Sequence, residues 1–441
     1  MTPLALLGPI TGPYTRTPWT DPTEGRRTTM AYVEPSGPDS WRVRYPKPDG
    51  SLGSLSGFTT KTEAENKAQE ITVDQRRAQF IDPDGGKITL TAWATEWFDA
   101  LDVGPNTERQ YRSFWINHLT PHWGRHSLDS ITNLSIRAWM KTKHHDGYAP
   151  TTVAAMVKLL SMMLSDAADE RLIHANPYRP HRRGRRRRAT PRERVHTTPD
   201  RALRIALHAA TLAGPWAAIL LITAAWTGAR WGELLALQRH NLHLTTGHMV
   251  IDPDEGNLLE VDGKFSFGYP KTDESARTIS LPPFLIVLLQ HHLTTHDHDF
   301  VFLTPNGDHP RRSNFSRRVM RPAADGTRNH PDHWPVLPPV QPGLTVHGLR
   351  HSHKTWLIAD LIPEIAQAKR LGHRIPDKIE HLYSHVAPEV EIRLLDSLQR
   401  RWNDALFTVT GLRPDNLPVP LLGARSAPVA RGPVRQLRTT G

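Results

Sequence analysis

Residues 178–194 constrain the folding of this 441-residue chain more than any other segment. They read YRPHRRGRRRRATPRER and hold nine arginines against one glutamate, a local net charge of +8 in a chain whose total is +11. Such a stretch cannot fold alone, because its like charges repel and it has almost nothing apolar to bury. It therefore separates two parts of the chain that must each build a core, and we interpret it as an interdomain linker.

The charge of the whole chain favours a polyanionic partner. Lys and Arg number 55 against 44 Asp and Glu, the pI is near 10.0, and each phosphate that a cation neutralises releases condensed counterions. Nucleic acid is the first candidate for this partner, and a membrane surface is the second. Only 12 of the cations are lysine, so the excess of arginine has an alternative explanation in a GC-rich genome. A charge run is usually solvated. If the two parts of the chain on either side of this linker hold a DNA duplex between them, however, the linker is placed to contact the DNA backbone. The candidate contacts are Arg185, Arg186, Arg187 and Arg188.

Composition also excludes several classes of protein. There is no cysteine, so the chain has no disulfide framework, thiolate zinc site or thiol nucleophile. The longest apolar run, Trp216–Trp226, has 11 residues, whereas a membrane span needs roughly 20. The N-terminus has no charged segment ahead of an apolar one. We therefore expect a soluble, cytoplasmic protein without a membrane partner.

Periodicity and composition divide the chain into segments. We predict a disordered extension over residues 1–29, with Met30 as an alternative start, and a disordered tail over 408–441. The folded parts are a small sheet with one helix (30–86), a helical bundle (87–177) and a mixed α+β domain (198–407) that follows the basic linker (178–197). The predicted fold class is thus multidomain and mainly α.

The sheet of the first domain offers a candidate DNA contact. SWRVRYPKPDGSLGSLSGF alternates apolar and polar residues around turn signals, and a helical pattern follows it. Trp41, Arg42 and Arg44 are candidates for a β-ribbon that lies in a DNA groove. The alternative is that Trp41 and the apolar residues two and four positions later pack on the helix.

Helix starts supply the candidates in the bundle. Asn106-Thr107 and Pro150-Thr151-Thr152 precede helical patterns, and the free N–H groups of a helix start suit phosphate contacts. Arg109, Arg112 and Lys158 are the nearby cations. The alternative is that these starts are ordinary caps.

The third domain mixes helices with short strands. Patterns predict helices over 200–213 and 216–238, strands near 248–251, 263–267 and 277–281, an irregular Pro-rich insertion over 322–342, and a last helix over 389–407. The apolar side of that last helix has two possible partners, a neighbouring protomer or its own domain.

Residues suited to phosphate chemistry gather in five motifs, which lie in three stretches of the chain. VHGLRHSHKTWL, LGH and LYSHV supply His347, Arg350, His373 and Tyr383, AWTGARWGELLAL supplies Arg230, and GYPKTDESARTISLP supplies Lys271. Phosphodiester cleavage without a metal needs a nucleophile, cations for the pentacoordinate state and an acid for the leaving oxygen. Arginine suits the second task, because its planar, permanently charged fork can hold two oxygens at once.

These motifs, in this order, resemble the tyrosine recombinases, and the chain looks like a phage-type integrase over roughly residues 88–407. Residues 31–69 look like the arm-site-binding domain that many integrases carry. Each motif alone arises by chance in many chains, whereas five in order are specific. The resemblance implies double-stranded DNA attachment sites as substrate, a homotetramer that works through a Holliday junction, and an accessory DNA-bending or directionality factor. It implies no cofactor and no metal.

The resemblance also implies a role for each residue. Arg230 and Arg350 clamp the phosphate, Lys271 is the general acid, and His347 and His373 bind the same phosphate and handle protons. Tyr383 is the nucleophile and forms a 3′-phosphotyrosine. Gly348 departs from the family, which commonly has an acidic residue there, and Glu380-His381 stands in place of the frequent threonines.

Three further questions stay open at this level. Glu233 is placed to orient Arg230 three residues earlier on a helix, or is a plain surface charge. His292 and His296 have a spacing that suits zinc, but with no third ligand patterned nearby we interpret them as solvated. The activity has two alternatives: a type IB topoisomerase, against which the arm-like domain argues, and a DNA-binding protein that has lost cleavage and acts in regulation or architecture.

Overall fold

The computed structural model describes residues 30–47, 50–77, 80–180, 194–268, 275–328, 335–373 and 386–411. The chain divides into two compact units, residues 1–184 and 185–441, and the division falls inside the predicted linker. The described residues build three separate hydrophobic cores, two in the first unit and one in the second.

The first core belongs to a small antiparallel sheet covered by one helix, as the sequence predicts. Strands β1 (Tyr32–Gly37), β2 (Ser40–Pro46) and β3 (Leu52–Phe58) pair in that order, and α1 (Lys61–Arg76) follows. Alternation along β2 places Val43 and Tyr45 on the face that α1 covers, where both are fully buried.

The second core lies in a helical bundle. Its elements are η1 (Gly85–Lys87), α2 (Leu90–Asp99), α3 (Pro105–Phe114), η2 (Trp115–Leu119), α4 (Thr120–Trp123), η3 (Leu128–Ser130), α5 (Asn133–His145) and α6 (Pro150–Asp169). By length and composition α6 could cross a bilayer, yet its apolar side chains pack in the bundle core, where Met156, Leu160 and Met163 are fully buried. The predicted helix starts near 106 and at 150 are confirmed, with Pro at the first position of each helix.

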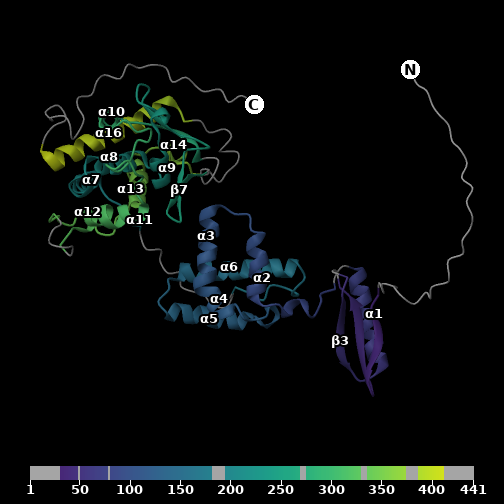
Figure 1. Ribbon diagram of the computed structural model, residues 1–441. Coiled ribbons are helices and arrows are strands. Elements are labelled where there is room, and N and C mark those ends of the chain that lie inside the picture. The colour runs from purple at the N-terminus through teal and green to yellow at the C-terminus, as the bar shows by residue number, and fades with distance from the viewer. Residues whose placement is uncertain are drawn as a thin grey trace, which may run out of the picture. The chain divides into compact units, whose positions relative to one another are not determined.

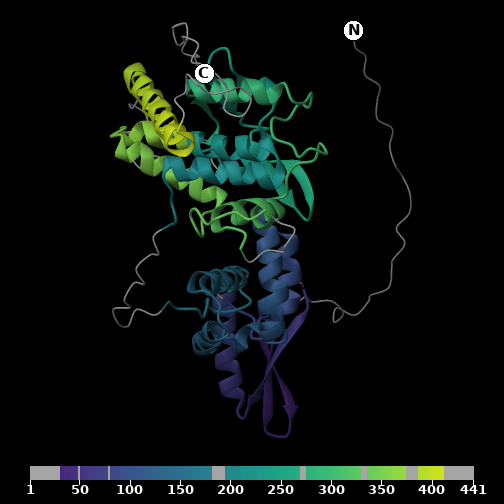
Figure 2. The ribbon, with the colours of Figure 1, turned by 90° about the vertical axis from the view of Figure 1, so that its left-hand side faces the viewer.

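The third core organises the second unit around α8 (Pro215–Thr227). Every residue from Ala217 to Thr227 is buried, and α8 contacts α7 (Pro199–Ala213), α10 (Pro283–Leu293) and α13 (Val346–Ala359). Figure 1 labels these helices in the second unit, and Figure 2 shows the same ribbon turned by 90°. A helix that is apolar all round is typical of such an interior position. The other helical elements are α9 (Trp231–Ala236), η4 (Arg239–Asn241), α11 (Arg312–Phe315), η6 (Ser316–Met320), α12 (Arg321–Asp325), α14 (Glu364–Leu371) and α16 (Pro388–Thr410).

Short antiparallel sheets complete this unit. One has the order β4-β5-β8, from β4 (Leu242–His243), β5 (His248–Ile251) and β8 (Arg277–Ser280), and the other pairs β6 (Leu258–Val261) with β7 (Lys264–Phe267). The three predicted strands are confirmed, whereas β4 and β6 were not predicted.

The prediction of one helix over 216–238 is wrong. Helix α8 ends at Thr227 because Gly228 adopts a left-handed conformation with φ of 69°. Arg230 is then extended, with φ of −76° and ψ of 156°, and caps the separate helix α9. Both sides of the break are apolar, so hydrophobic periodicity alone does not reveal it.

The last helix, α16, packs on its own unit. Leu394, Leu398 and Trp402 are buried, and the Trp402 ring stacks on Phe284 with centroids 4.1 Å apart. Of the two partners considered for its apolar side, the described residues thus show its own domain.

Candidate active site

Four of the six predicted catalytic residues fall within the described part of the chain. They are Arg230, His347, Arg350 and His373. Lys271 and Tyr383 lie outside the described residues, as do Arg185, Arg186, Arg187 and Arg188.

Helix α13 positions two of these residues on its first turns. Thr345 caps the helix by accepting the Gly348 N–H at 3.0 Å, and His347 and Arg350 follow one turn apart. A Cβ on Gly348 would lie 2.8 Å from Leu344 Cδ1 and 3.1 Å from the Val195 carbonyl oxygen. A side chain at position 348 would therefore meet close packing.

Arg350 is buried, and both of its terminal nitrogens donate to protein groups. It donates to the Gly228 carbonyl at 2.7 Å, to the Leu371 carbonyl, and to His373 Nε2 at 2.8 Å. Burial, together with the nearby Arg230, lowers the pKa of Arg350 to about 9, which leaves it cationic at neutral pH. The contact to His373 requires a lone pair on Nε2, so His373 is neutral with its proton on Nδ1.

Arg230 reaches the same place from the start of α9. It donates to Glu233 Oε1 at 2.6 Å, to Ser275 Oγ at 3.3 Å and to the Gly372 carbonyl at 3.1 Å. Glu233 Oε2 also accepts the Arg230 backbone N–H at 2.8 Å. The Glu233 side chain is only 2% exposed, so the alternative that it is a surface charge is wrong.

The Leu-Gly-His motif has a physical basis in the end of α14. Gly372 adopts a left-handed conformation with φ of 60°, which ends the helix and directs the chain to His373. Leu371 and Gly372 are consecutive, and their carbonyls accept Arg350 and Arg230 respectively. The two guanidinium groups are thereby brought to one end of one helix, with His373 beside them.

The cluster suits an anion. Partial burial, followed by the charge of Arg350, lowers the pKa of His373 to about 4, and burial with His351 and Arg350 nearby does the same for His347. Both imidazoles therefore stay neutral near pH 7, because protonation would add charge to a group of cations. A bound phosphate would reverse that penalty, so the arrangement can hold a phosphodiester between the two arginines and His373, with His347 one turn before Arg350 on α13.

Sequence reasoning missed two contributors to this cluster. Arg277, on β8, donates to both carboxylate oxygens of Glu233, at 3.1 and 2.9 Å. Arg194 contacts His351 Nε2 at 2.9 Å and helps to lower the pKa of His347. Arg277 lies in the same motif as Lys271. The available signal was an arginine at the start of a predicted short strand, where a charged side chain needs a partner.

Comparisons with known proteins agree with this geometry. The phage integrase family matches residues 197–389. The chain is 27% identical over 346 residues to a protein of Mycobacterium tuberculosis named as a prophage phiRv2 integrase, covering 76% of this chain and 85% of that protein. It is 24% identical over 298 residues to the integrase of Mycobacterium phage L5, covering 66% of this chain and 73% of that integrase. This chain is a tyrosine recombinase of the phage integrase type.

The fold agrees as well. The Tn1549 transposon integrase, in a structure with transposon right end DNA, matches with a TM-score of 0.55 at 17% identity, covering 70% of the recombinase and 99% of the transposon integrase. At that identity the likeness concerns the fold, and it confirms the predicted multidomain, mainly helical class.

The predicted DNA contacts of the small sheet do not form one cluster in the recombinase. Arg42 and Arg44 lie on the sheet face opposite α1 and both pair with Glu34, Arg44 at 2.8 Å. Trp41 is partly buried against the core of this sheet, as the packing alternative predicts.

The candidate DNA contacts of the helical bundle are cations on the surfaces of α3 and α6. Arg112 pairs with Glu108 at 2.8 Å and lies 4.9 Å from the centroid of the Phe98 ring. Arg109 is exposed on the same helix, and Lys158 is exposed on α6. Whether any of these cations touches DNA stays a prediction.

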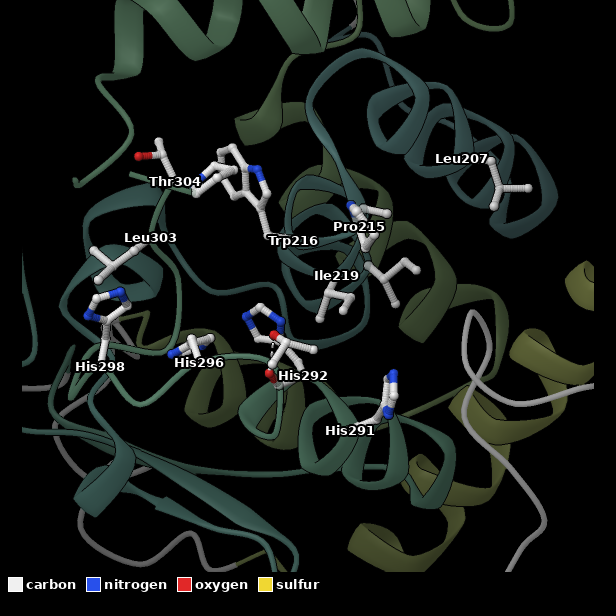
Figure 3. A pocket seen from close by; sticks show the side chains of 14 residues that line it. Leu207, Pro215, Trp216, Ile219, His291, His292, His296, His298, Leu303 and Thr304 are labelled. Atoms are coloured by element: carbon white, nitrogen blue, oxygen red, sulfur yellow. Dashed lines mark hydrogen bonds between the residues drawn. The ribbon is translucent and has the colours of Figure 1, made fainter. Parts of the chain in front are cut away.

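The histidine-rich segment lines a cavity of about 490 Å³, where Figure 3 shows His291, His292, His296 and His298 together with Trp216 and other apolar side chains. The interpretation of His292 as solvated is wrong: it is 4% exposed, its Nε2–H donates to the Val301 carbonyl at 2.7 Å, and its ring stacks on Phe302. Among the described residues, no group of three or more His, Asp or Glu is arranged to hold a metal ion.

Proposed function

We propose that this recombinase cleaves and rejoins DNA at specific attachment sites through a 3′-phosphotyrosine on Tyr383, and that it integrates or excises a mobile element. The observation that supports the chemistry best is the convergence of Arg230 and Arg350 on consecutive carbonyls, with His373 in contact, ten residues before Tyr383 along the chain. The names of its relatives, a phage and a prophage integrase, support the role in a mobile element.

In the proposed reaction the arginines hold the two non-bridging oxygens of the scissile phosphate. The Tyr383 oxygen attacks phosphorus and passes its proton to a neutral imidazole of the cluster, the bond to the 5′ oxygen breaks, and Lys271 delivers a proton to that leaving oxygen. His347 and His373 donate hydrogen bonds to the same phosphate. The phosphotyrosine conserves the energy of the broken bond, so the 5′ hydroxyl of a second DNA can attack it and release the tyrosine.

The partner is double-stranded DNA, and the assembly is a homotetramer. Exchange between two duplexes requires four strand cleavages, and one tyrosine per protomer supplies one cleavage each. The arginine-rich linker and the cations of the first unit extend the contact along the duplex. An accessory DNA-bending or directionality factor completes the proposal, which places the protein on DNA in the cytoplasm.

A nicked suicide substrate tests the nucleophile directly. We expect the wild type to form a covalent DNA adduct, and Tyr383→Phe to bind the same DNA with no adduct, because only the attacking oxygen is removed. Tyr269→Phe is the matched control, since Tyr269 and Tyr383 are the two tyrosines of residues 185–441. An adduct with Tyr383→Phe on a denaturing gel would mean that another residue attacks. A wild type that binds but never forms an adduct would favour a regulatory DNA-binding protein instead.

A further inference from the structure

Three arginines from three elements meet at the carboxyl end of α14. The carbonyls of the consecutive residues Arg370, Leu371 and Gly372 accept Arg277 Nε, Arg350 Nη2 and Arg230 Nη2, the first at 2.7 Å and the last at 3.1 Å. The last carbonyls of a helix have no partner inside it and carry the negative end of its dipole, so they suit guanidinium groups. Two of these arginines belong to the proposed phosphate clamp. The third, Arg277, has no role assigned to it so far.

Arg277 is saturated by protein groups. Its Nη1 donates to Glu233 Oε1 at 3.1 Å and to the Ser275 carbonyl at 2.7 Å, and its Nη2 donates to Glu233 Oε2 at 2.9 Å. Its side chain is 6% exposed. All three nitrogens of the Arg277 guanidinium donate to protein groups, so its effect on the reaction passes through Glu233.

Glu233 is shared between two cations of unequal exposure. Arg230 is 29% exposed and contacts Oε1 at 2.6 Å, whereas the buried Arg277 contacts both oxygens. The three side chains together keep one net positive charge, and the exposed member that carries it is Arg230. With Arg277 absent, Glu233 and Arg230 would form a neutral pair, and a phosphate would have to compete with a buried carboxylate for the guanidinium.

We propose that Arg277 is a positioning residue for phosphate binding: it occupies Glu233 so that Arg230 keeps its charge for the anion, and it ties β8 to the end of α14. The inference rests on the proposed function in one respect, namely that the anion at Arg230 is the scissile phosphate. Glu233 then orients Arg230 without neutralising it, because Arg277 satisfies the carboxylate.

A double-mutant cycle separates this role from a structural one. Arg277→Gln should lower the single-turnover cleavage rate at saturating nicked DNA by roughly 10- to 100-fold, the range for weakening one group that stabilises charge at the phosphate. Adding Glu233→Gln removes the competing carboxylate and restores the net charge, so the double variant should cleave at least about tenfold faster than Arg277→Gln alone. Deleting both partners of a buried ion pair can also restore stability, so thermal melts accompany the cycle and only the cleavage rate of the folded enzyme is compared.

Arg401→Gln is the matched control, because Arg401 makes a two-bond pair with Asp360, at 2.7 and 2.8 Å, in the same unit. It should lower thermal stability and leave the cleavage rate of the folded enzyme unchanged. Arg277→Lys keeps the charge, loses the fork, and should lose less activity than Arg277→Gln. If Arg277→Gln fails to fold, Arg277→Met, which also removes the charge, replaces it in the cycle.

The pH profile provides a second readout. Relative to wild type, Arg277→Gln should recover cleavage as pH falls, because a protonated Glu233 no longer neutralises Arg230, and the double variant should lack this acid limb. Two results would overturn the positioning role while the proposed function stands. Arg277→Gln could cleave as fast as the wild type, or the double variant could cleave as slowly as Arg277→Gln. Absence of a wild-type adduct overturns both.

Discussion

At the scale of single residues, Lys271 and Arg350 carry different parts of the proposed reaction, so a modified substrate should separate them. Sulfur in place of the 5′ bridging oxygen is a leaving group that needs no acid. Lys271→Ala should bind DNA and cleave the natural substrate roughly 10² to 10⁴ times more slowly, the range for general acids, and the sulfur substrate should largely restore its rate. Arg350→Ala should stay slow on both substrates, because its defect is in charge stabilisation.

The measurement is single-turnover cleavage of paired oxygen and sulfur substrates. If both variants fail equally on sulfur, Lys271 belongs with the phosphate-binding or structural residues. Lys264, the other lysine near this hairpin and the first residue of β7, would then be the next candidate for the acid.

His292 makes the second unit sensitive to acid. Burial lowers its pKa from 6.5 to about 4. Between these values the unfolded chain binds a proton that the folded chain refuses, so stability falls as pH falls through that window, by at most about 1.4 kcal/mol per pH unit. His292→Gln can still donate to the Val301 carbonyl and should flatten this slope, measured as the denaturant midpoint against pH. The control is His291→Gln, at a partly exposed neighbouring position, which should keep the wild-type slope.

A remaining slope is expected even in His292→Gln, because His353 acts in the same direction. It is fully buried, its Nδ1–H donates to the Ala225 carbonyl, and its Nε2 accepts from Arg370 at 3.0 Å. Burial and the charge of Arg370 hold its pKa well below the ordinary value. A slope in His292→Gln identical to wild type would contradict the assignment to His292.

At the scale of elements, the break between α8 and α9 places Arg230 and supplies a carbonyl that accepts Arg350. Gly228 ends α8, its carbonyl accepts Arg350, and Arg230 begins α9 two residues later. A Cβ on Gly228 would lie 2.6 Å from Leu371 Cδ2 and 2.9 Å from His353 Cδ2. The end of α8 therefore fits closely against α13 and the end of α14, and that fit holds the site together.

Gly228→Ala should consequently cost both stability and cleavage. Left-handed backbone costs a non-glycine residue about 1–2 kcal/mol, and overpacking adds about 1–3 kcal/mol. Gly214→Ala is the control, because Gly214 at the other end of α8 also has a positive φ, 101°, but a Cβ there meets nothing closer than 3.5 Å. Both variants should lower the melting temperature, and only Gly228→Ala should lose cleavage when folded. Equal cleavage by the two variants would show that the break does not align the arginines.

At the scale of the whole molecule, the two units are joined by a segment whose charge is most of the net charge of the chain. If this linker follows DNA, replacing Arg185, Arg186, Arg187 and Arg188 with Ser should weaken binding to all sequences. It should also make the negative slope of log K against log salt less steep, by up to roughly 0.9 for each lost phosphate contact. Titrations at several salt concentrations measure both effects.

The control removes the same charge elsewhere. Arg425, Arg431, Arg435 and Arg438 lie in the C-terminal tail, and their replacement with Ser changes the net charge by the same amount. We expect that variant to keep the wild-type slope. An unchanged slope in the linker variant would mean a solvated linker, and equal changes in both would mean that total charge, not contact, sets the affinity.

The sequence by itself determined the parts of this protein that depend on local patterns. Residue chemistry and order identified Arg230, His347, Arg350 and His373, and the structure brings Arg230, Arg350 and His373 together at the end of α14. Periodicity placed most helices and three strands, because the choice between helix and strand follows from which neighbours along the chain face the core.

Only the tertiary structure decided what those residues touch. Arg230 and Gly372 are 142 positions apart, Arg350 and Gly228 are 122 apart, and no local pattern links either pair. The burial of Glu233, its capture by Arg277 and the burial of His292 arise in the same way, because each depends on which segments pack together. Burial then sets the pKa of a histidine or the available charge of an arginine, and these properties belong to the folded environment and not to the residue type.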